Sequence, residues 1–368
     1  MTLDGQIIKE EQSETKRVLP IFFPPPIVTY LYFPYQLSII LAHDKTKPWF
    51  FSNFIQLFSK LNSNSIWLLH FFPDIYMVQN NQYFIEVARV NENVVEIKRG
   101  EMAKRLCEWI GNGYYVCVIL SESALPGSMM YGREPYPHPQ FFFGYDLATK
   151  TLKLTNFDSH SKYSVIDVGF VDFENALFSD DTARAMETYS AWDHNLPSKY
   201  LFFLYKFNDK EHFRYDLDVT KIKESLEDYL QGRDTSYRYK LVNPWMLEYA
   251  DSQWGVGVYK NLETHLRDGE KKGIDYRAFH GLWEHKKIMT SRLRYLEESG
   301  SLDGNEDLAA QYAAVERRAN DIRMYILKCI YSGSPIRTAG IISNINKMGD
   351  LETSILSRTC HLLDNYNS

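Results

Sequence analysis

The sequence of 368 residues predicts an α+β fold, in which helices near the start of the chain precede a mostly antiparallel sheet. Between residues 113 and 171, short apolar or alternating runs follow one another with polar turns between them, which is typical of hairpin-connected strands. After about residue 218, apolar residues recur at helical spacing. We therefore expect a loose, charged tail at 1–17, a sheet-containing domain at 18–217, and a helical region packed on that core at 218–368.

The centre of the predicted sheet is a group of three consecutive strands. Residues 114–120 form a near-continuous apolar run rich in Tyr and Val, which indicates a strand buried on both faces. Residues 140–145 are aromatic, and after a polar turn residues 151–155 alternate Leu with Thr and Lys, which predicts a hairpin. Further short strands are expected at 83–90, 164–171 and 200–206, and residues 64–71 form another short apolar run.

Two helices are predicted before the sheet. Proline is favoured at the first position of a helix, and Pro34 directly precedes a largely apolar segment, so a short buried helix is expected at 35–43. Residues 49–61 place six large apolar side chains at helical spacing, which predicts a second helix. The remaining helices are expected at 101–111, 172–192, 219–230 (ended by Gly232), 256–268, 275–299, 306–331 and 350–364.

Composition and motifs argue against several classes of protein. A net charge of −6 provides no basic field for nucleic acid. No apolar run reaches the roughly 18 residues needed to span a membrane, and the polar start does not resemble a signal peptide, so we expect a cytoplasmic protein without a membrane partner. No glycine-rich phosphate loop occurs, and no cofactor is expected.

Metal-binding patterns are also missing from the sequence. The four Cys contain no CxxC pair, which argues against both a zinc site and a disulfide framework. His280, Glu284 and His285 lie close together in sequence, but a helical zinc site needs two His four residues apart. We therefore expect no metal.

A candidate catalytic pair follows from the three central strands. His138 stands at the head of the middle strand, and Asn156 stands at the foot of the next one. Because the hairpin folds the chain back, we expect their side chains to face each other, which is how papain-like enzymes hold a base and its orienting group. Asp158 is an alternative partner, since it lies on the same face if the strand continues. A loop histidine that only covers a strand is the structural alternative.

Several short motifs occur in a characteristic order. They are Gly-Tyr-Tyr-Val (113–116), Leu-Pro (125–126), Tyr-Pro-His (136–138), Phe-Gly-Tyr-Asp (143–146), Asn-Phe-Asp (156–158), Lys-Tyr-Ser (162–164), Trp-Gly-Val (254–256) with Tyr259, and Asp-Tyr-Arg (275–277) with Glu-His-Lys-Lys (284–287). This order resembles the butirosin-biosynthesis-protein-H-like family over roughly residues 20–330. The resemblance implies a papain-like core adapted to amide formation, in which an acyl group passes from the phosphopantetheine arm of a carrier protein to an amine. It places the family's catalytic His at His138 and its orienting Asp at Asn156.

The chain departs from this family at the nucleophile. The family carries a Cys at the start of the first buried helix, where the helix dipole lowers the thiol pKa. Residues 33–38 read Phe-Pro-Tyr-Gln-Leu-Ser and contain no Cys. Ser38 lies about one turn inside the predicted helix, Cys107 on another helix and Cys117 within a strand, so none is placed for the role.

The sequence is compatible with three functions. The first is an acyl or peptidyl transferase of peptide or antibiotic biosynthesis, in which His138 takes the proton of a small amine or amino acid during direct attack on the carrier thioester. The second is a catalytically inactive homologue that acts as a carrier-binding scaffold. The third is a hydrolase with an unidentified nucleophile. His138→Ala is expected to abolish product in the first case and to leave carrier binding intact in the second.

Overall fold

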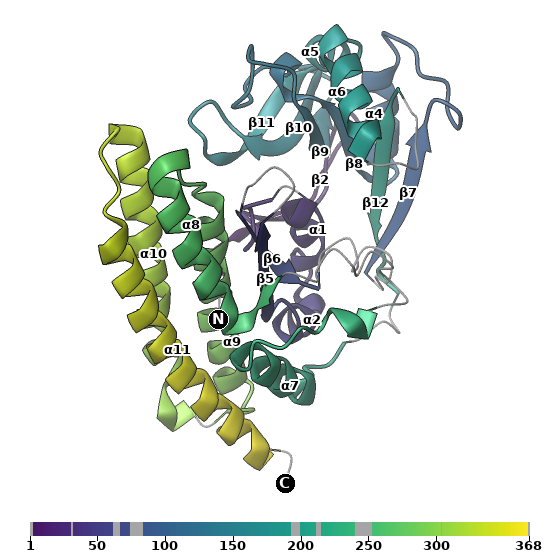
Figure 1. Cartoon of the computed structure of the whole chain (residues 1–368). Coiled ribbons are helices and arrows are strands. Elements are labelled where there is room, and N and C mark those ends of the chain that lie inside the picture. Colours follow the sequence, from purple (N-terminus) through teal and green to yellow (C-terminus); the bar gives the residue numbers. More distant parts are fainter. Residues whose placement is uncertain are drawn as a thin grey trace. The chain divides into compact units, whose positions relative to one another are not determined.

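The computed structural model describes residues 3–30, 32–61, 67–73, 84–192, 199–210, 215–239, 252–302 and 304–366 (Figure 1). It is a mixed α+β structure with antiparallel sheets and a helical C-terminal part, as the sequence predicts. The chain divides into two compact units. We call residues 4–44 and 82–213 the sheet unit, and residues 1–3, 45–81 and 214–368 the helical unit. Residues 45–81, which were expected to belong with the sheet, therefore group with the C-terminal helices.

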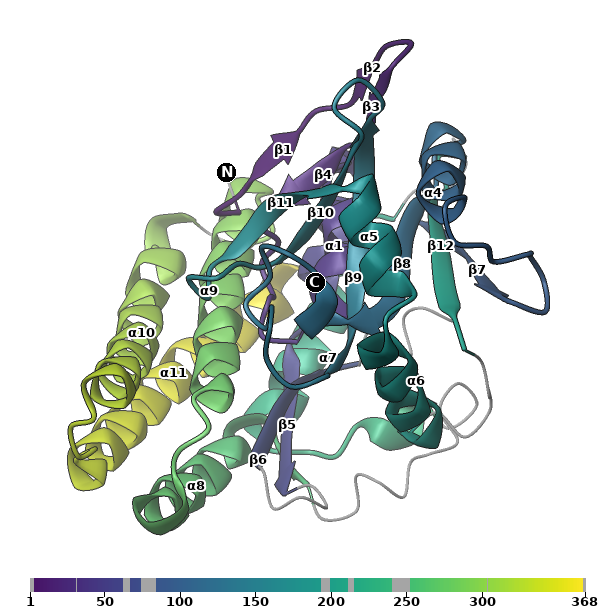
Figure 2. The ribbon, with the colours of Figure 1, turned by 90° about the horizontal axis from the view of Figure 1, so that it is seen from above.

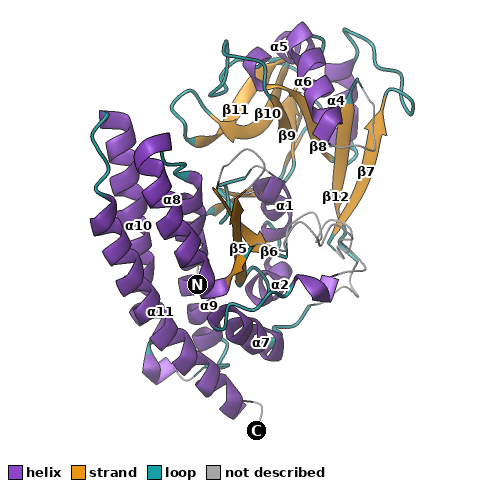
Figure 3. Ribbon diagram, viewed as in Figure 1, coloured by secondary structure: helices purple, strands orange, loops and turns teal. Residues whose placement is uncertain are grey.

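One antiparallel sheet organises the sheet unit (Figure 3). Its strands lie in the order β11 (Tyr163–Gly169), β10 (Thr151–Phe157), β9 (Pro137–Asp146), β8 (Tyr115–Ser121), β12 (Leu201–Phe207) and β7 (Ile85–Asn91). These strands confirm the predicted ones to within a few residues, with residue 83 lying outside the described part. Every residue of β8 is buried, as its continuous apolar run predicts.

Short N-terminal strands extend this unit. β1 (Gln6–Ile8) pairs with β4 (Ile21–Phe23), and β2 (Glu11–Gln12) pairs with β3 (Lys16–Val18). β3 also pairs with the last three residues of β9. Part of the segment expected to be a loose tail is therefore strand. Short, charged strands are a common way to finish the edge of a sheet, which explains how such a polar sequence is accommodated.

The two faces of β9 carry different helices. Side chains alternate between the faces, so Phe141 and Phe142 point in opposite directions. The Phe141 ring stacks on Tyr35 of α1 (Tyr32–Leu41), with ring centroids 5.0 Å apart, and the Tyr35 hydroxyl donates to the carbonyl of Pro139 at 2.6 Å. The Phe142 ring instead meets Phe173 edge-on at 5.4 Å. Phe173 belongs to α5 (Phe170–Leu177), so α1 and α5 contact opposite faces of β9.

The helix predicted at 172–192 is interrupted. α5 ends at Leu177, and α6 (Asp180–Trp192) begins after Ser179, whose hydroxyl accepts a hydrogen bond from the backbone N–H of Thr182 at 3.0 Å. Such a side-chain bond is a helix N-cap, which explains the new start. Together with α4 (Met102–Gly111), α5 and α6 pack on the sheet (Figure 2).

The predicted helix at 49–61 is wrong in its second half. α2 (Lys47–Ser52) stops at Asn53, which is extended, and Phe54 adopts a positive φ of 57°. The following residues form β5 (Gln56–Leu61), which pairs with β6 (Trp67–Phe72) and β13 (Gln253–Trp254). Closely spaced aromatic residues suit a buried strand as well as a helix, so periodicity alone does not distinguish the two. Of the short apolar run noted at 64–71, residues 64–66 lie outside the described part.

Five longer helices complete the helical unit. They are α7 (Val219–Leu230), α8 (Val258–Lys272), α9 (Arg277–Glu298), α10 (Leu308–Ser332) and α11 (Thr338–Tyr366). The predicted helices are confirmed, although α11 begins twelve residues before the expected start at 350. Asp218 caps α7 by accepting from the N–H of Lys221 at 2.9 Å. Across the described residues, no helix is both long and apolar enough to cross a membrane.

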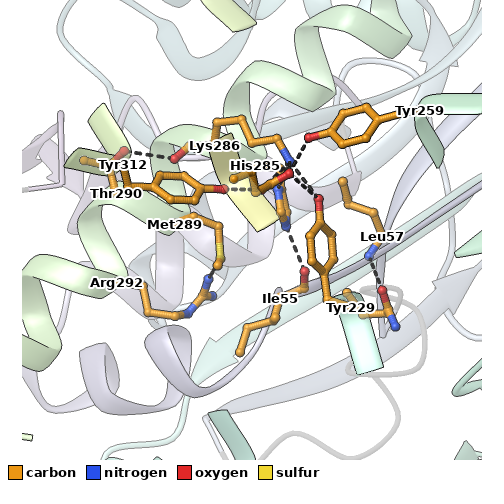
Figure 4. A network of polar contacts seen from close by, with 12 residues as sticks. Ile55, Leu57, Tyr229, Tyr259, His285, Lys286, Met289, Thr290, Arg292 and Tyr312 are labelled. Atoms are coloured by element: carbon orange, nitrogen blue, oxygen red, sulfur yellow. Dashed lines mark hydrogen bonds and ion pairs between the residues drawn. The ribbon is translucent and has the colours of Figure 1, made fainter. Parts of the chain in front are cut away.

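A buried ion pair lies at the centre of these helices (Figure 4). Lys286 Nζ is 2.8 and 3.0 Å from the two carboxylate oxygens of Glu352, and neither side chain is exposed. The hydroxyls of Tyr229, Tyr259 and Tyr312 all donate to the same carboxylate. Burial holds the pKa of each tyrosine well above its usual value, so the hydroxyls remain donors at neutral pH. One carboxylate therefore connects α7, α8, α9, α10 and α11.

Helix α9 also holds the turn between α2 and β5. Arg292 is fully buried, and its guanidinium donates to the carbonyls of Phe51, at 2.7 Å, and Asn53. His285, two turns earlier, lies with Nε2 2.8 Å from the carbonyl of Ile55. These side chains satisfy carbonyl oxygens in the last turn of α2 and in the residues between α2 and β5.

Candidate active site

His138 is partly exposed and is paired with a buried carboxylate. Its Nδ1 lies 2.5 Å from Oε2 of Glu122. The His138 side chain is 23% exposed and that of Glu122 is 1% exposed. A carboxylate next to one ring nitrogen orients an imidazole and leaves the other nitrogen for chemistry, which is the arrangement used by histidine bases.

The register of β8 and β9 produces this pairing. Leu120 lies opposite His138, and the N–H of Glu122 donates to the carbonyl of Tyr136 at 3.2 Å just beyond the end of β8. Glu122 is therefore a diagonal cross-strand neighbour of His138 on the same face. Diagonal neighbours in a sheet lie within reach of long side chains, so a Glu at this position can meet the ring.

Asn156 has a different partner from the expected one. Its side-chain amide donates to Oε1 of Gln140 at 2.7 Å, and its carbonyl oxygen accepts from the N–H of Phe157 at 2.6 Å. Gln140 is two residues beyond His138 and lies on the same face of β9. Asn156 and Gln140 are both fully buried. The amide expected to orient His138 therefore belongs to a buried pair deeper in the sheet.

Asp158 lies in the turn after β10. Its carboxylate accepts from the hydroxyl of Ser164 at 2.8 Å and from the N–H groups of His160 and Lys162, and the Ser164 bond is the main cause of a lowered Asp158 pKa. Asp158 also forms a bridge with Ser128.

The loop between β8 and β9 accounts for this position of Asp158. At its residues 128 and 129 the loop folds back to pair with the end of β10, and the N–H of Met129 donates to the carbonyl of Phe157 at 2.9 Å. Asp158 could face His138 only if the start of β9 paired with the end of β10, and residues 128 and 129 occupy that position instead. The contact with His138 that was expected of Asn156 or Asp158 is therefore made by Glu122.

The position expected for a nucleophile carries none of the usual groups. Ser38 lies in α1, is fully buried, and its hydroxyl has no hydrogen-bond partner among the described residues. α1 contacts the face of Phe141, whereas His138 lies on the face of Phe142. Ser38 is therefore neither accessible nor on the side of the sheet where His138 lies.

The four cysteines are all free and buried. Burial raises the pKa of the Cys107 thiol to about 12 and that of Cys117 higher still. Because the thiolate is the nucleophilic form, these groups are unreactive at neutral pH. A covalent thioester on this chain has no candidate cysteine.

The two histidines of α9 have different partners. His280 Nε2 lies 3.3 Å from Glu284, whereas His285 Nε2 lies 2.8 Å from the carbonyl of Ile55. In the part of the chain that the structure describes, no group of three or more His, Cys, Asp or Glu side chains is arranged to hold a metal ion.

Polar and aromatic groups surround the His138–Glu122 pair. The ring of Tyr136 is 5.4 Å from the His138 ring, and this tyrosine is 44% exposed. Ser121 and Ser123, on either side of Glu122, share a hydrogen bond of 2.7 Å, and Ser123 also donates to Asp181 at 2.9 Å. The pair therefore lies at the border between a buried polar layer and solvent.

Sequence reasoning did not identify Glu122, although one signal pointed to it. Glu122 is the first acid after the apolar run that forms β8, and the chain returns to His138 only 16 residues later. No family model matches the chain, and no curated protein matches it either.

Proposed function

We propose that this protein is an acyl or peptidyl transferase that forms an amide from a carrier-bound acyl thioester and an amine, with His138 as the general base. The observation that supports this proposal is the partly exposed imidazole whose Nδ1 is held by the buried Glu122 carboxylate. A base needs an oriented ring and an accessible nitrogen, and a positioned base contributes about 10²–10⁴-fold to a reaction rate.

The proposed reaction proceeds without a covalent intermediate on the chain. The amine nitrogen attacks the thioester carbonyl, Nε2 of His138 accepts the amine proton, and the carbon–sulfur bond breaks as the amide forms. The same proton then passes to the leaving sulfur of the phosphopantetheine arm. The burial of all four cysteines and the raised pKa of the Cys107 thiol support direct attack over acyl transfer through a thiol.

The proposed transferase acts on two partners. They are an acyl or peptidyl carrier protein with its phosphopantetheine arm and a small amine or amino acid, in the cytoplasmic biosynthesis of a peptide or antibiotic. The papain-like core is also part of it, and the packing of α1 against an antiparallel sheet supports this fold. The residues that carry the resemblance to the butirosin-biosynthesis-protein-H-like family support the substrate class.

A catalytically inactive, carrier-binding scaffold is the second candidate. Three observations favour it: α1 carries no Cys, Ser38 is buried, and α1 contacts the face of the sheet opposite to His138. In a scaffold, the His138–Glu122 pair would only cover the end of the sheet.

Product formation separates the two candidates. The protein is incubated with an acyl-loaded carrier and a panel of amines, and amides are measured by mass spectrometry. The transferase predicts product with the natural chain and a loss of at least about 100-fold in His138→Ala. His160→Ala changes a histidine of the turn after β10 and is expected to leave product unchanged. Absence of product from the natural chain, with carrier binding retained, contradicts the transferase and supports the scaffold.

A further inference from the structure

We infer that Glu122 is a positioning residue for His138, and that its carboxylate fixes the ring so that Nε2 is the nitrogen that exchanges protons with the substrate. This inference rests on the proposed function for its catalytic meaning. The geometry behind it is independent of any substrate. It also gives the orienting role to a residue outside the motifs that carry the family resemblance.

Glu122 is almost completely buried. A carboxylate that is 1% exposed has lost its hydration, and burying such a group is costly unless it is paired. Oε2 contacts His138 Nδ1, whereas Oε1 has no hydrogen-bond partner within the described residues. The hydrogen bond with the imidazole must therefore offset the desolvation cost of the buried carboxylate, and this holds the His138 ring close to Oε2.

The backbone holds Glu122 in place from two sides. Its N–H donates to the carbonyl of Tyr136 at 3.2 Å. Its carbonyl accepts from the hydroxyl of Ser128 at 2.8 Å and from the N–H of Leu125 at 3.1 Å. The carboxylate is thus positioned by the end of β8 and by the loop that follows it. A rigid attachment of this kind is what an orienting group needs, since catalysis depends on the geometry of the base.

The chemistry of the contact sets the tautomer. An ionised carboxylate only accepts hydrogen bonds, so Nδ1 of His138 carries the hydrogen that lies between the two side chains. The neutral ring then has its lone pair on Nε2, which makes no hydrogen bond to any described residue. With the His138 side chain 23% exposed, this nitrogen is the one available to a substrate amine.

The test reads the tautomer directly and needs no substrate. The imidazole of His138 is observed by ¹H–¹⁵N NMR in the natural chain, in Glu122→Gln and in Glu122→Met. We expect a strongly deshielded Nδ1 proton in the natural chain. It moves upfield in Glu122→Gln, because a neutral amide oxygen is a weaker acceptor than a carboxylate. In Glu122→Met the acceptor is gone, and the ring shifts toward the tautomer protonated at Nε2.

A matched control separates orientation from general loss of structure. Glu174 is a second buried carboxylate of the sheet unit, and it accepts from the N–H groups of Gly100 and Ala103 at the start of α4. Glu174→Gln removes its charge but leaves His138 untouched, so the imidazole signals are expected to stay as in the natural chain. An unchanged Nδ1 proton in a folded Glu122→Gln overturns the inference.

Kinetics distinguish this inference from the proposed function. If the protein forms amides, Glu122→Met lowers kcat by about 100-fold with little change in KM, and Glu122→Gln retains an intermediate rate. If the NMR signals respond as expected but no protein forms product, the proposed function fails and the positioning of His138 stands. If product forms and Glu122→Met keeps the natural kcat, the positioning role is wrong.

Discussion

Replacing Glu352 by Gln is expected to destabilise the helical unit by about 3–5 kcal/mol, although the side chains are nearly the same size. The change leaves the Lys286 ammonium fully buried without its counter-charge. Burial already lowers the pKa of Lys286, and the opposing effect of Glu352 would be lost. Burying an unpaired charge is much more costly than burying a matched pair, which is the reason for the large expected effect.

The magnitude follows from what each variant leaves behind. Lys286→Met is expected to cost about 2–4 kcal/mol, because the Glu352 carboxylate stays buried but keeps three tyrosine donors. In the double variant no charge remains, and the amide oxygen that replaces the carboxylate still accepts from the tyrosine hydroxyls. The double variant is therefore expected to lose about 3 kcal/mol less than the sum of the single changes.

The assay is a double-mutant cycle measured by guanidinium unfolding, followed by hydrogen exchange in peptides from α7 to α11. Exchange is needed because a chain with two units does not guarantee two-state unfolding. Lys223→Met is the control. Lys223 of α7 pairs with Asp364 of α11 at 2.6 Å on the surface of the protein. It therefore connects the same two helices as the buried contact between Tyr229 and Glu352. Its replacement is expected to change stability far less.

Additivity would refute the reasoning. If the two single changes add to within about 0.5 kcal/mol, Lys286 and Glu352 are not energetically coupled in the way that the geometry indicates. A Glu352→Gln variant as stable as the natural chain would be equally damaging, since it would mean that the lysine is neutral or hydrated.

Two further predictions concern the helical unit. Burial holds the pKa of His285 well below 6.5, so below about pH 6.5 the unfolded chain binds a proton at this residue that the folded chain does not. The free energy of unfolding therefore falls with falling pH, by up to about 1.4 kcal/mol per pH unit for this group. His285→Gln should flatten that slope in denaturant titrations between pH 7 and 5, and an unchanged slope would assign the pH dependence to other groups. Gly255 has a φ of +53°, and an added Cβ would overlap the carbonyl oxygen of Tyr229, so Gly255→Ala should destabilise the protein by about 3 kcal/mol. Gly340 lies in α11 with open space around it, so Gly340→Ala should stabilise the protein by about 0.5–1 kcal/mol. Equal shifts of the melting temperature in the two variants would contradict this prediction.

Local signals explain which elements could be predicted from the sequence. α7 was predicted with its observed ends, because its apolar stripe and the Gly232 that ends it both lie within one short segment. β8 was predicted for a similar reason, since a continuous apolar run is sufficient to indicate a buried strand.

Long-range contacts explain where prediction failed. The aromatic residues at 49–61 satisfied helical periodicity, yet the chain turns at Asn53 and Phe54. The carbonyls at this turn are satisfied by Arg292, which is 239 residues beyond Asn53. No pattern within residues 49–61 contains that partner.

The candidate site shows the same division. His138 was identified from its place at the head of a strand, a local feature. Its partner depends on a diagonal contact across β8 and β9, and on the pairing of residues 128 and 129 with the end of β10. Both follow from the way the loop folds back, which spacing along the sequence does not describe.

The attachment of the α2–β5 turn to α9 has a consequence for the order in which the chain acquires its structure during synthesis. The hydrogen bonds of Arg292 and His285 to this turn join residues 230 to 241 positions apart, and most of the sheet unit lies between them. The turn must therefore leave the ribosome long before its partners exist, and residues 82–213 are complete first. Because domains tend to fold as they emerge, the sheet unit has the opportunity to fold as an insertion while the early segment of the helical unit waits for α9.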